Sequence, residues 1–196
     1  MPTVVIGNSR ELSSCVMSQM HDFRYDVFVK RLGWSLPMLH GLEKDQYDTP
    51  EAKYVLLHNN EGRITACARL LATTSAYMLP ELFPQLLGDE QTPRDAGVWE
   101  LSRFATSVRQ TREGRILTLS QPTLDFLGLI LDFARGRAIE QLVLVTSVGI
   151  ERLLLRAGVP VHRLAPPAII DGSLHVALFI EVNASTPASS SQRCIV

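Results

Sequence analysis

Two long segments with helical periodicity, each set among short apolar runs, constrain the fold of this chain most strongly. Within residues 11–32 and again within 118–137, apolar side chains recur at steps of three and four, the spacing of one face of an α-helix. A shorter helix is predicted over 147–157, with Gly158 and Pro160 after it. Strands are predicted for the apolar runs 3–6, 54–57, 64–71, 98–106, 141–146, 161–164 and 174–182. The order β, α, ββ, β, α, β, α, ββ predicts an α/β (α+β) domain, with a central sheet of mixed direction flanked by helices.

The length of 196 residues, 46% of them hydrophobic, favours one domain, which we place at 1–183. The remaining segment, 184–196, is rich in Ser, Ala and Pro and is expected to be flexible. Residues 33–52 show no clear period and predict a long functional loop. A short helix at 79–87 and a polar loop at 109–115 complete the predicted elements.

Charge and cysteine content exclude several classes of protein. Nineteen Lys and Arg stand against twenty Asp and Glu, so nothing indicates a nucleic-acid or membrane-surface partner. No apolar run is long enough to cross a bilayer, and the start lacks the pattern of a signal peptide. Cys15, Cys67 and Cys194 form no CxxC motif, which predicts a cytoplasmic protein. The five histidines show no metal-ligand spacing, and no metal site is expected.

The strand VWELSRFATS, at 98–107, carries two charges inside an apolar run. In an ideal strand Glu100 and Arg103 point to opposite faces, unless a bulge redirects one of them. An enclosed carboxylate must meet a cation or a ligand, because burying an unpaired charge is costly. Glu100 is therefore a candidate functional residue. A pair between Glu100 and Arg69 that only joins neighbouring strands is the alternative.

Four more charged residues lie where packing does not require them. Arg24 belongs to the first helix, Asp45 and Asp48 to the long loop, and Arg69 to the strand ACARLL. Each alone has an ordinary explanation, such as a surface position, a turn cap or a local ion pair.

Together and in this order, these residues make the chain resemble the acyl-homoserine lactone synthases, the LuxI-type autoinducer synthases of bacterial quorum sensing. The matching segments are FRYDVFVKRLGW, EKDQYD, CARLLATT and VWELSRFA, and the later VTSVGIERLLLRAG is similar to the acyl-side segment of the family. The resemblance runs from about Arg24 to Gly158. It implies a fold similar to that of the GNAT acyltransferases, which agrees with the predicted order of elements.

The resemblance also implies an activity. Members of the family transfer an acyl chain from acyl-carrier protein, or in some cases acyl-CoA, to the amine of S-adenosylmethionine, and ring closure then expels methylthioadenosine. S-adenosylmethionine would be a co-substrate, and no prosthetic group is implied. Glu100 would be the general base, acting directly or through a water, with Ser102 and Arg103 completing the catalytic set.

Three groups of binding residues follow from the resemblance. The S-adenosylmethionine site would comprise Arg24, Phe28, Trp34, Asp45, Asp48, Arg69 and Arg103, which supply charges of both signs and aromatic faces for an onium group. The acyl pocket would be lined by Leu101, Phe104, Val145, Thr146, Ile150, Leu153 and Phe179, although core packing also explains most of them. A basic face of Arg152, Arg156 and Arg163 would dock an acidic acyl-carrier protein, with a solvated helix face as the alternative.

Two other functions remain open at this point. An ordinary GNAT N-acyltransferase would be expected to carry a glycine-rich turn for the pyrophosphate of CoA, and the segment SVRQTREGRILTLS has a single glycine, Gly114. A non-catalytic module that binds an acyl ligand would not need Glu100 together with the acidic loop residues and the arginines. The oligomeric state does not follow from the sequence.

Overall fold

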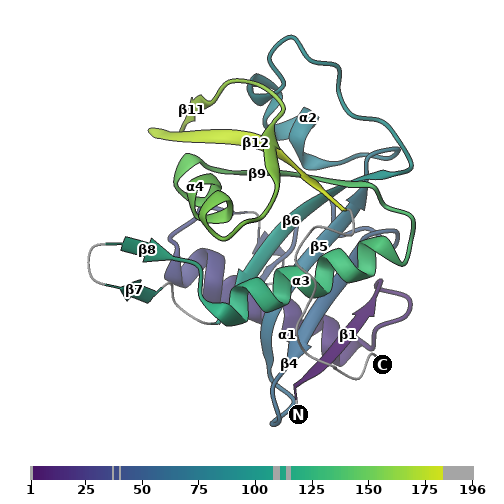
Figure 1. Cartoon of the computed structure of the whole chain (residues 1–196). Coiled ribbons are helices and arrows are strands. Elements are labelled where there is room, and N and C mark those ends of the chain that lie inside the picture. The colour runs from purple at the N-terminus through teal and green to yellow at the C-terminus, as the bar shows by residue number, and fades with distance from the viewer. Residues whose placement is uncertain (1, 37, 40, 108–110, 114–115, 183–196) are drawn as a thin grey trace. The chain divides into compact units, whose positions relative to one another are not determined.

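The computed structural model describes residues 2–36, 38–39, 41–107, 111–113 and 116–182 (Figure 1). The chain forms two compact units. Among the described residues, the first unit comprises those up to 71 together with 103–107, and the second comprises 72–102, 111–113 and 116–182. The single domain predicted over 1–183 stays a prediction, and the predicted flexible tail at 184–196 lies outside the described residues.

The first unit is built on antiparallel strands that lie side by side in Figure 1. Its elements, in chain order, are β1 (Thr3–Gly7), α1 (Ser14–Arg24), the π-helix η1 (Tyr25–Arg31), β2 (Met38–Leu39), β3 (Leu42–Glu43), β4 (Lys53–His58) and β5 (Ile64–Ala72). Strand β4 pairs with β1 on one side and with β5 on the other, as the predicted hairpin requires. The second half of β6 (Val98–Thr106) completes this unit, and the N–H of Ser107 donates to the carbonyl of Thr65 at 2.7 Å.

The first helix differs from the prediction at both ends. It begins at Ser14 rather than at residue 11, because Ser13 caps it by accepting the N–H of Val16. From Tyr25 to Arg31 it continues as a π-helix, so the segment is helical as predicted, with wider turns in its second part. The wider turns bring the N–H of Trp34 to the carbonyl of Phe28 at 2.9 Å. Gly33 then leaves the helix with a φ of 72°, which favours glycine.

The segment 33–52 is more ordered than the predicted loop. It contains the short antiparallel pair β2–β3 and then a tight turn, in which the N–H of Asp48 donates to the carbonyl of Asp45 at 3.1 Å. This turn carries the acidic residues that the sequence singled out.

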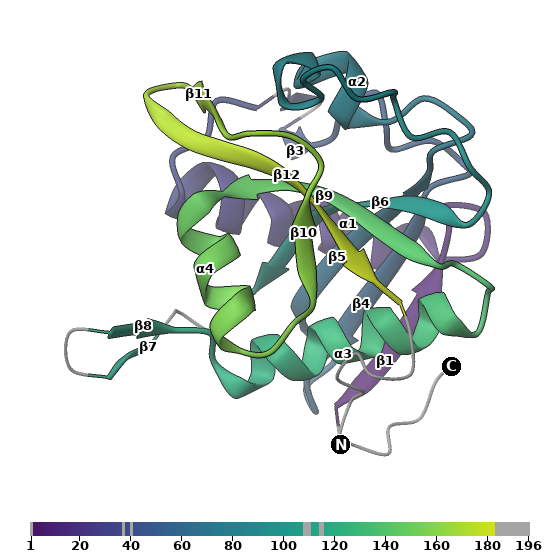
Figure 2. The same ribbon diagram turned by 45° about the horizontal axis from the view of Figure 1, so that its top comes forward.

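The second unit contains both parallel and antiparallel strands. Its elements are α2 (Met78–Leu82), the 3₁₀-helix η2 (Pro84–Leu86), the first half of β6, β7 (Thr111–Glu113), β8 (Ile116–Thr118), α3 (Gln121–Arg135), β9 (Gln141–Ser147), α4 (Val148–Arg156), β10 (Val161–Arg163), β11 (Ala168–Ile170) and β12 (Ser173–Glu181). Strand β6 runs parallel to β9, β9 pairs antiparallel with β12, and β12 pairs with both β10 and β11. Helix α4 packs against β9, β10 and β12 (Figure 2). The predicted α+β class with strands of mixed direction is confirmed.

Several short elements of the second unit were not predicted. The predicted helix at 79–87 is divided into α2 and η2, and the described part of the predicted polar loop is strand β7. Helix α3 begins at Gln121, because residues 116–118 belong to β8 and Ser120 caps the helix. Strand β11 has only three residues, and it turns into β12 through Asp171 and Gly172, both with positive φ.

Within the described residues, no helix has the length and apolar character needed to cross a membrane. In the same part of the chain, no three metal-ligating side chains are grouped closely enough to hold a metal ion.

Candidate active site

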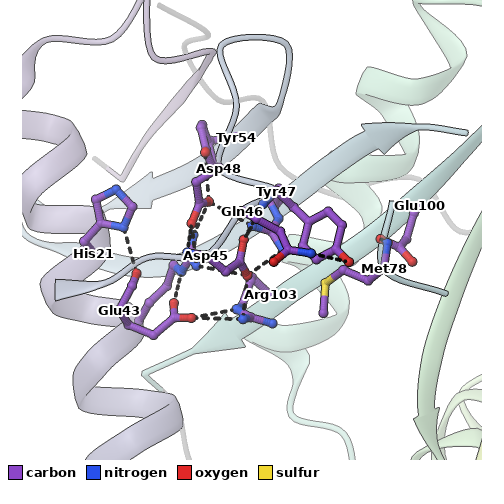
Figure 3. Close-up of polar contacts among 12 residues, drawn as sticks. His21, Glu43, Asp45, Gln46, Tyr47, Asp48, Tyr54, Met78, Glu100 and Arg103 are labelled. Atoms are coloured by element: carbon purple, nitrogen blue, oxygen red, sulfur yellow. Dashed lines mark hydrogen bonds and ion pairs between the residues drawn. The ribbon is translucent and has the colours of Figure 1, made fainter. Parts of the chain in front are cut away.

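Six buried charged side chains form a network in the first unit (Figure 3). Three are arginines and three are carboxylates, so their formal charges cancel. Helix α1 supplies Arg24, strand β5 supplies Arg69 and strand β6 supplies Arg103. The carboxylates are Glu43 at the end of β3 and the two aspartates of the turn, Asp45 and Asp48.

Arg24 binds two of these carboxylates. Its Nη1 and Nη2 donate to Oδ1 and Oδ2 of Asp48 at 2.7 and 3.0 Å, a bidentate pair, and its Nε donates to Oε2 of Glu43. The Arg24 side chain is 1% exposed. Two-point geometry and exclusion of water make such a pair both strong and directional.

The other two arginines close the network. Arg69 donates from Nη1 to Oδ1 of Asp45 at 2.5 Å and to Oδ1 of Asp48 at 2.9 Å. Arg103 donates from Nε to Oε1 of Glu43 at 3.0 Å and from Nη2 to Oδ2 of Asp45 at 2.7 Å. Each carboxylate therefore bridges two arginines, and the six side chains form a closed ring of alternating charge, which we call the ionic ring. Its geometry fixes the turn at 45–48 against α1, β5 and β6.

Burial and neighbouring charges act in opposite directions within the ionic ring. Burial raises the pKa of Asp48, but Arg24 and Arg69 outweigh it and hold that pKa well below its ordinary value. Burial lowers the pKa of Arg24, yet Asp48 and Glu43 raise it overall. Tyr54 donates its hydroxyl to Oδ1 of Asp48 at 2.9 Å, and burial followed by the charge of Asp48 raises the pKa of Tyr54.

Arg103 occupies a conformation that a strand residue rarely adopts. Its φ is 51°, in the left-handed region, which is disfavoured for residues other than glycine. Arg103 thus departs from regular strand geometry within β6. The thiol of Cys67 donates to the Arg103 carbonyl at 3.3 Å, and the guanidinium lies 5.7 Å from the centre of the Phe28 ring. These contacts, with those of the ionic ring, hold the disfavoured conformation in place.

An aromatic pair borders the ionic ring. Phe28 and Trp34 stack with ring centres 5.0 Å apart and planes inclined by 22°. Phe28 is buried, whereas Trp34 is 47% exposed. All seven residues predicted to bind S-adenosylmethionine therefore belong to the first unit and are linked by contacts there.

Three residues of this region were not predicted from the sequence: Glu43, Tyr54 and His21. Glu43 was detectable as the first of the three acidic residues of EKDQYD, two positions before Asp45. Tyr54 looked like an ordinary strand residue of the hairpin. His21 lies one turn before Arg24, and its Nδ1 is 2.9 Å from the Glu43 carbonyl, to which it donates.

Glu100 belongs to the second unit and is 2% exposed. Its Oε2 accepts the backbone N–H of Met78 at 3.0 Å (Figure 3). Its Oε1 accepts the backbone N–H of Leu79 at 2.8 Å. The carboxylate therefore caps the first turn of α2. The sequence left open a pair between Glu100 and Arg69. In the structure, Arg69 binds Asp45 and Asp48. Ser102, which is also predicted to take part in catalysis, is half-buried.

The residues predicted to line the acyl pocket are divided between the units. Phe104 lies in the first unit, and the other six lie in the second. Pairing of β9 with β12 places Val145 and Phe179 on one face, because they occupy positions of the same parity in register, and Thr146 on the other. Arg163 projects from the Thr146 face and binds Glu151 of α4. On α4, Leu153 is buried and Ile150 is half-buried.

All three predicted docking arginines are exposed, and Arg163 also has a structural partner. Arg152 and Arg156 lie on the exposed face of α4. Arg163 donates from Nε and Nη2 to the two carboxylate oxygens of Glu151 at 2.6 and 2.7 Å. This pair joins α4 to β10 and lowers the pKa of Glu151.

His21 predicts a pH-dependent contribution to stability. Burial lowers its pKa, and the bond to the Glu43 carbonyl offsets this only in part. The folded chain therefore keeps His21 neutral where the unfolded chain binds a proton, so folding is favoured less as the pH falls below about 6.5. We expect His21→Gln to show a shallower loss of unfolding free energy between pH 7 and 5 in urea titrations. An unchanged slope, or one matched by His162→Gln at an exposed ring, would exclude this role.

Comparison with known proteins identifies the family to which this chain belongs. A family model described as autoinducer synthase matches residues 8–188. An acyl-homoserine-lactone synthase from Acinetobacter nosocomialis is 38% identical over 181 residues, which cover 91% of this chain and 99% of the relative.

Solved structures of acyl-homoserine lactone synthases are also similar to this chain. The acyl-homoserine lactone synthase LasI has a TM-score of 0.83 and 34% identity, covering 98% of this chain and 99% of LasI. BjaI, a CoA-dependent acyl-homoserine lactone synthase solved with SAM and isopentyl-CoA, has a TM-score of 0.82 and 26% identity, covering 94% of this chain and 85% of BjaI.

The fold itself is more widespread. A protein from Lactobacillus plantarum described as an N-acetyltransferase has a TM-score of 0.63 at 16% identity, covering 93% of this chain and 99% of that protein. This likeness confirms the predicted GNAT-like fold and carries no further functional argument. The family match over 8–188 and the identity to acyl-homoserine-lactone synthases show that this chain belongs to the autoinducer synthase family.

Proposed function

We propose that this chain makes an acyl-homoserine lactone by transferring an acyl group from a thioester to the amine of S-adenosylmethionine. The amine attacks the thioester carbonyl, the thiol leaves, and an amide forms. The carboxylate of the acylated substrate then attacks its own γ-carbon, which closes the lactone and releases methylthioadenosine. The observation that carries the proposal is the ionic ring with its aromatic border, on a chain whose relatives are acyl-homoserine-lactone synthases.

Glu100 has the role of general base in this proposal. An ammonium group cannot attack a carbonyl, so a proton must leave before the amide bond forms. Glu100 is an enclosed carboxylate, two residues before Ser102 on β6. Ser102 and backbone N–H groups are proposed to stabilise the oxyanion of the tetrahedral intermediate.

Burial suggests a division of work within the ionic ring. Arg24, Arg69 and Asp48 have side chains that are at most 1% exposed and are engaged with one another. Asp45 and Arg103 are each 6% exposed at the side chain. We infer that the first three position the last two, and that Asp45 and Arg103 meet the amine and the carboxylate of S-adenosylmethionine. Phe28 and Trp34 would cover the sulfonium or the adenosine, as aromatic faces do for onium groups.

The acyl donor is proposed to be a carrier protein, with acyl-CoA as the alternative that the BjaI complex supports. The exposed side chains of Arg152 and Arg156 favour an acidic partner. We expect the double variant Arg152→Glu, Arg156→Glu to raise the KM for acyl-carrier protein roughly tenfold, leaving the KM for S-adenosylmethionine unchanged. Steady-state kinetics at two salt concentrations measures this, because a docking charge is screened by salt.

Arg163→Ala is the matched comparison for the docking variants. Because Glu151 already binds this arginine, the loss should appear in stability rather than in the KM for the carrier protein. Equal KM values for all variants and the wild type would remove α4 from the docking surface.

Mass spectrometry of organic extracts from bacteria that express the chain tests the proposed function. We expect a homoserine lactone ion whose mass gives the acyl length and the state of its third carbon. Extracts without such an ion, from cells rich in S-adenosylmethionine and acyl donors, would contradict the proposal. Cytoplasmic location stays a prediction based on the unpaired cysteine pattern.

A further inference from the structure

We propose that the first turn of α2 is a positioning element for catalysis, with the N–H groups of Met78 and Leu79 fixing the orientation and the ionised form of Glu100. This inference rests on the proposed role of Glu100 as general base. The residues that supply the donors, Met78 and Leu79, carry none of the sequence features that marked the rest of the site.

The contact geometry is two-sided. Each carboxylate oxygen of Glu100 accepts one N–H, at 3.0 and 2.8 Å, so rotation of the carboxyl group about its last bond would break both bonds. Met78 is 8% exposed and Leu79 is fully buried, so water does not readily replace these donors. The carboxylate plane is therefore set by the backbone of α2.

The two donors also favour one protonation state. A carboxylate accepts at both oxygens, whereas a carboxylic acid must use one oxygen to carry a proton, which faces an N–H unfavourably. Hydrogen bonds to a charged acceptor thus oppose the effect of burial, which favours the neutral acid. The group that receives the amine proton is in this way kept ready to accept it.

The rest of the segment between β5 and β6 holds α2 in place. The hydroxyl of Thr73 donates to the carbonyls of Asp95 and Val98 at 3.0 and 2.8 Å, which ties the two ends of the segment together. Tyr77, just before α2, donates its hydroxyl to the carbonyl of Pro93 at 2.7 Å. The support is thus independent of Glu100 itself.

Tyr77 is a titratable group of the second unit that is electrostatically coupled to Glu100. Burial and then the charge of Glu100 raise the pKa of Tyr77 to about 12, while Arg94 lowers it. On the parallel neighbour strand β9, the residue opposite Glu100 is Val143, which does not titrate. Tyr77 stays neutral across the range in which the enzyme would be assayed.

Met78→Pro tests the inference, with Met78→Ala as the matched control. Proline removes the N–H but is well tolerated at the first position of a helix, and Tyr77 before it is already extended, with φ −148° and ψ 166°. Alanine keeps the N–H and loses the same side chain. We expect kcat of the proline variant to fall about tenfold relative to the alanine variant, and the acidic limb of its pH–rate profile to move up by about one pH unit.

The outcomes separate this inference from the proposed function. If Glu100→Gln is inactive while the two Met78 variants share one kcat and one pH profile, the positioning role is wrong and the base assignment stands. If Glu100→Gln is fully active, Glu100 is not the general base, and the proposed function of this residue is wrong rather than the positioning role alone. Should Met78→Pro not fold, infrared spectroscopy of the wild type shows whether Glu100 is ionised. The band of Glu100 is identified as the one that is lost in Glu100→Gln. A carboxylate band at neutral pH supports the inference, and a protonated carboxyl band overturns it.

Discussion

Glu100→Gln is expected to reduce kcat about 10²- to 10⁴-fold, the usual contribution of a general base. Glutamine has the same size and cannot accept the amine proton. One of its two terminal groups is an NH₂, which faces a backbone N–H of α2 where the carboxylate accepted a bond. Steady-state kinetics with S-adenosylmethionine and an acyl thioester measures the loss.

Binding of S-adenosylmethionine should survive this substitution, because all seven predicted contact residues lie in the first unit. Isothermal titration of the variant with S-adenosylmethionine provides the control, and a melting curve shows whether α2 is disturbed. A variant that keeps more than half of the wild-type kcat would exclude Glu100 as the base.

Asp48→Ala is expected to destabilise the fold by about 3–5 kcal/mol, the usual result of leaving buried charges without their partner. Asp48 accepts from Arg24, Arg69 and Tyr54, and its side chain is 0% exposed. Removing it opens the ionic ring on one side and leaves two buried guanidinium groups short of acceptors. Urea unfolding, followed by circular dichroism, gives the change in unfolding free energy.

Arg10→Ala provides the surface comparison for Asp48→Ala. Arg10 pairs with Glu51 at 3.2 Å, but both side chains are about two-thirds exposed, so its loss should change stability by about 1 kcal/mol or less. Equal effects of the two substitutions would mean that the ionic ring contributes no more than a surface pair.

The sequence predicted the elements of the fold well where periodicity was long. Helices α1, α3 and α4 and strands β4, β5, β6, β9 and β12 lie where apolar spacing placed them. Periodicity could not reveal the π-helix η1, because the same apolar spacing also fits an α-helix. Strands β7, β8 and β11 have three residues each and were not predicted, whereas β10, of the same length, was placed by the run at 161–164.

The candidate site was only partly predictable for a related reason. Arg24, Asp45, Asp48, Arg69 and Arg103 stood out as charges in unexpected places, but which charge meets which depends on elements far apart in the sequence. Glu43 completes the ionic ring from β3, a two-residue strand within a segment without clear period. The partners of Glu100 are backbone groups, which no residue pattern encodes.

The central claim is that this chain joins an acyl group to S-adenosylmethionine and closes the lactone. Purified protein, given an acyl thioester and S-adenosylmethionine labelled with ¹³C in its aminobutyryl carbons, tests it most directly by mass spectrometry. The account predicts an acyl-homoserine lactone that carries the label, formed with one equivalent of unlabelled methylthioadenosine and absent with Glu100→Gln. Label recovered only in unreacted S-adenosylmethionine, while the protein still binds it, would contradict the account.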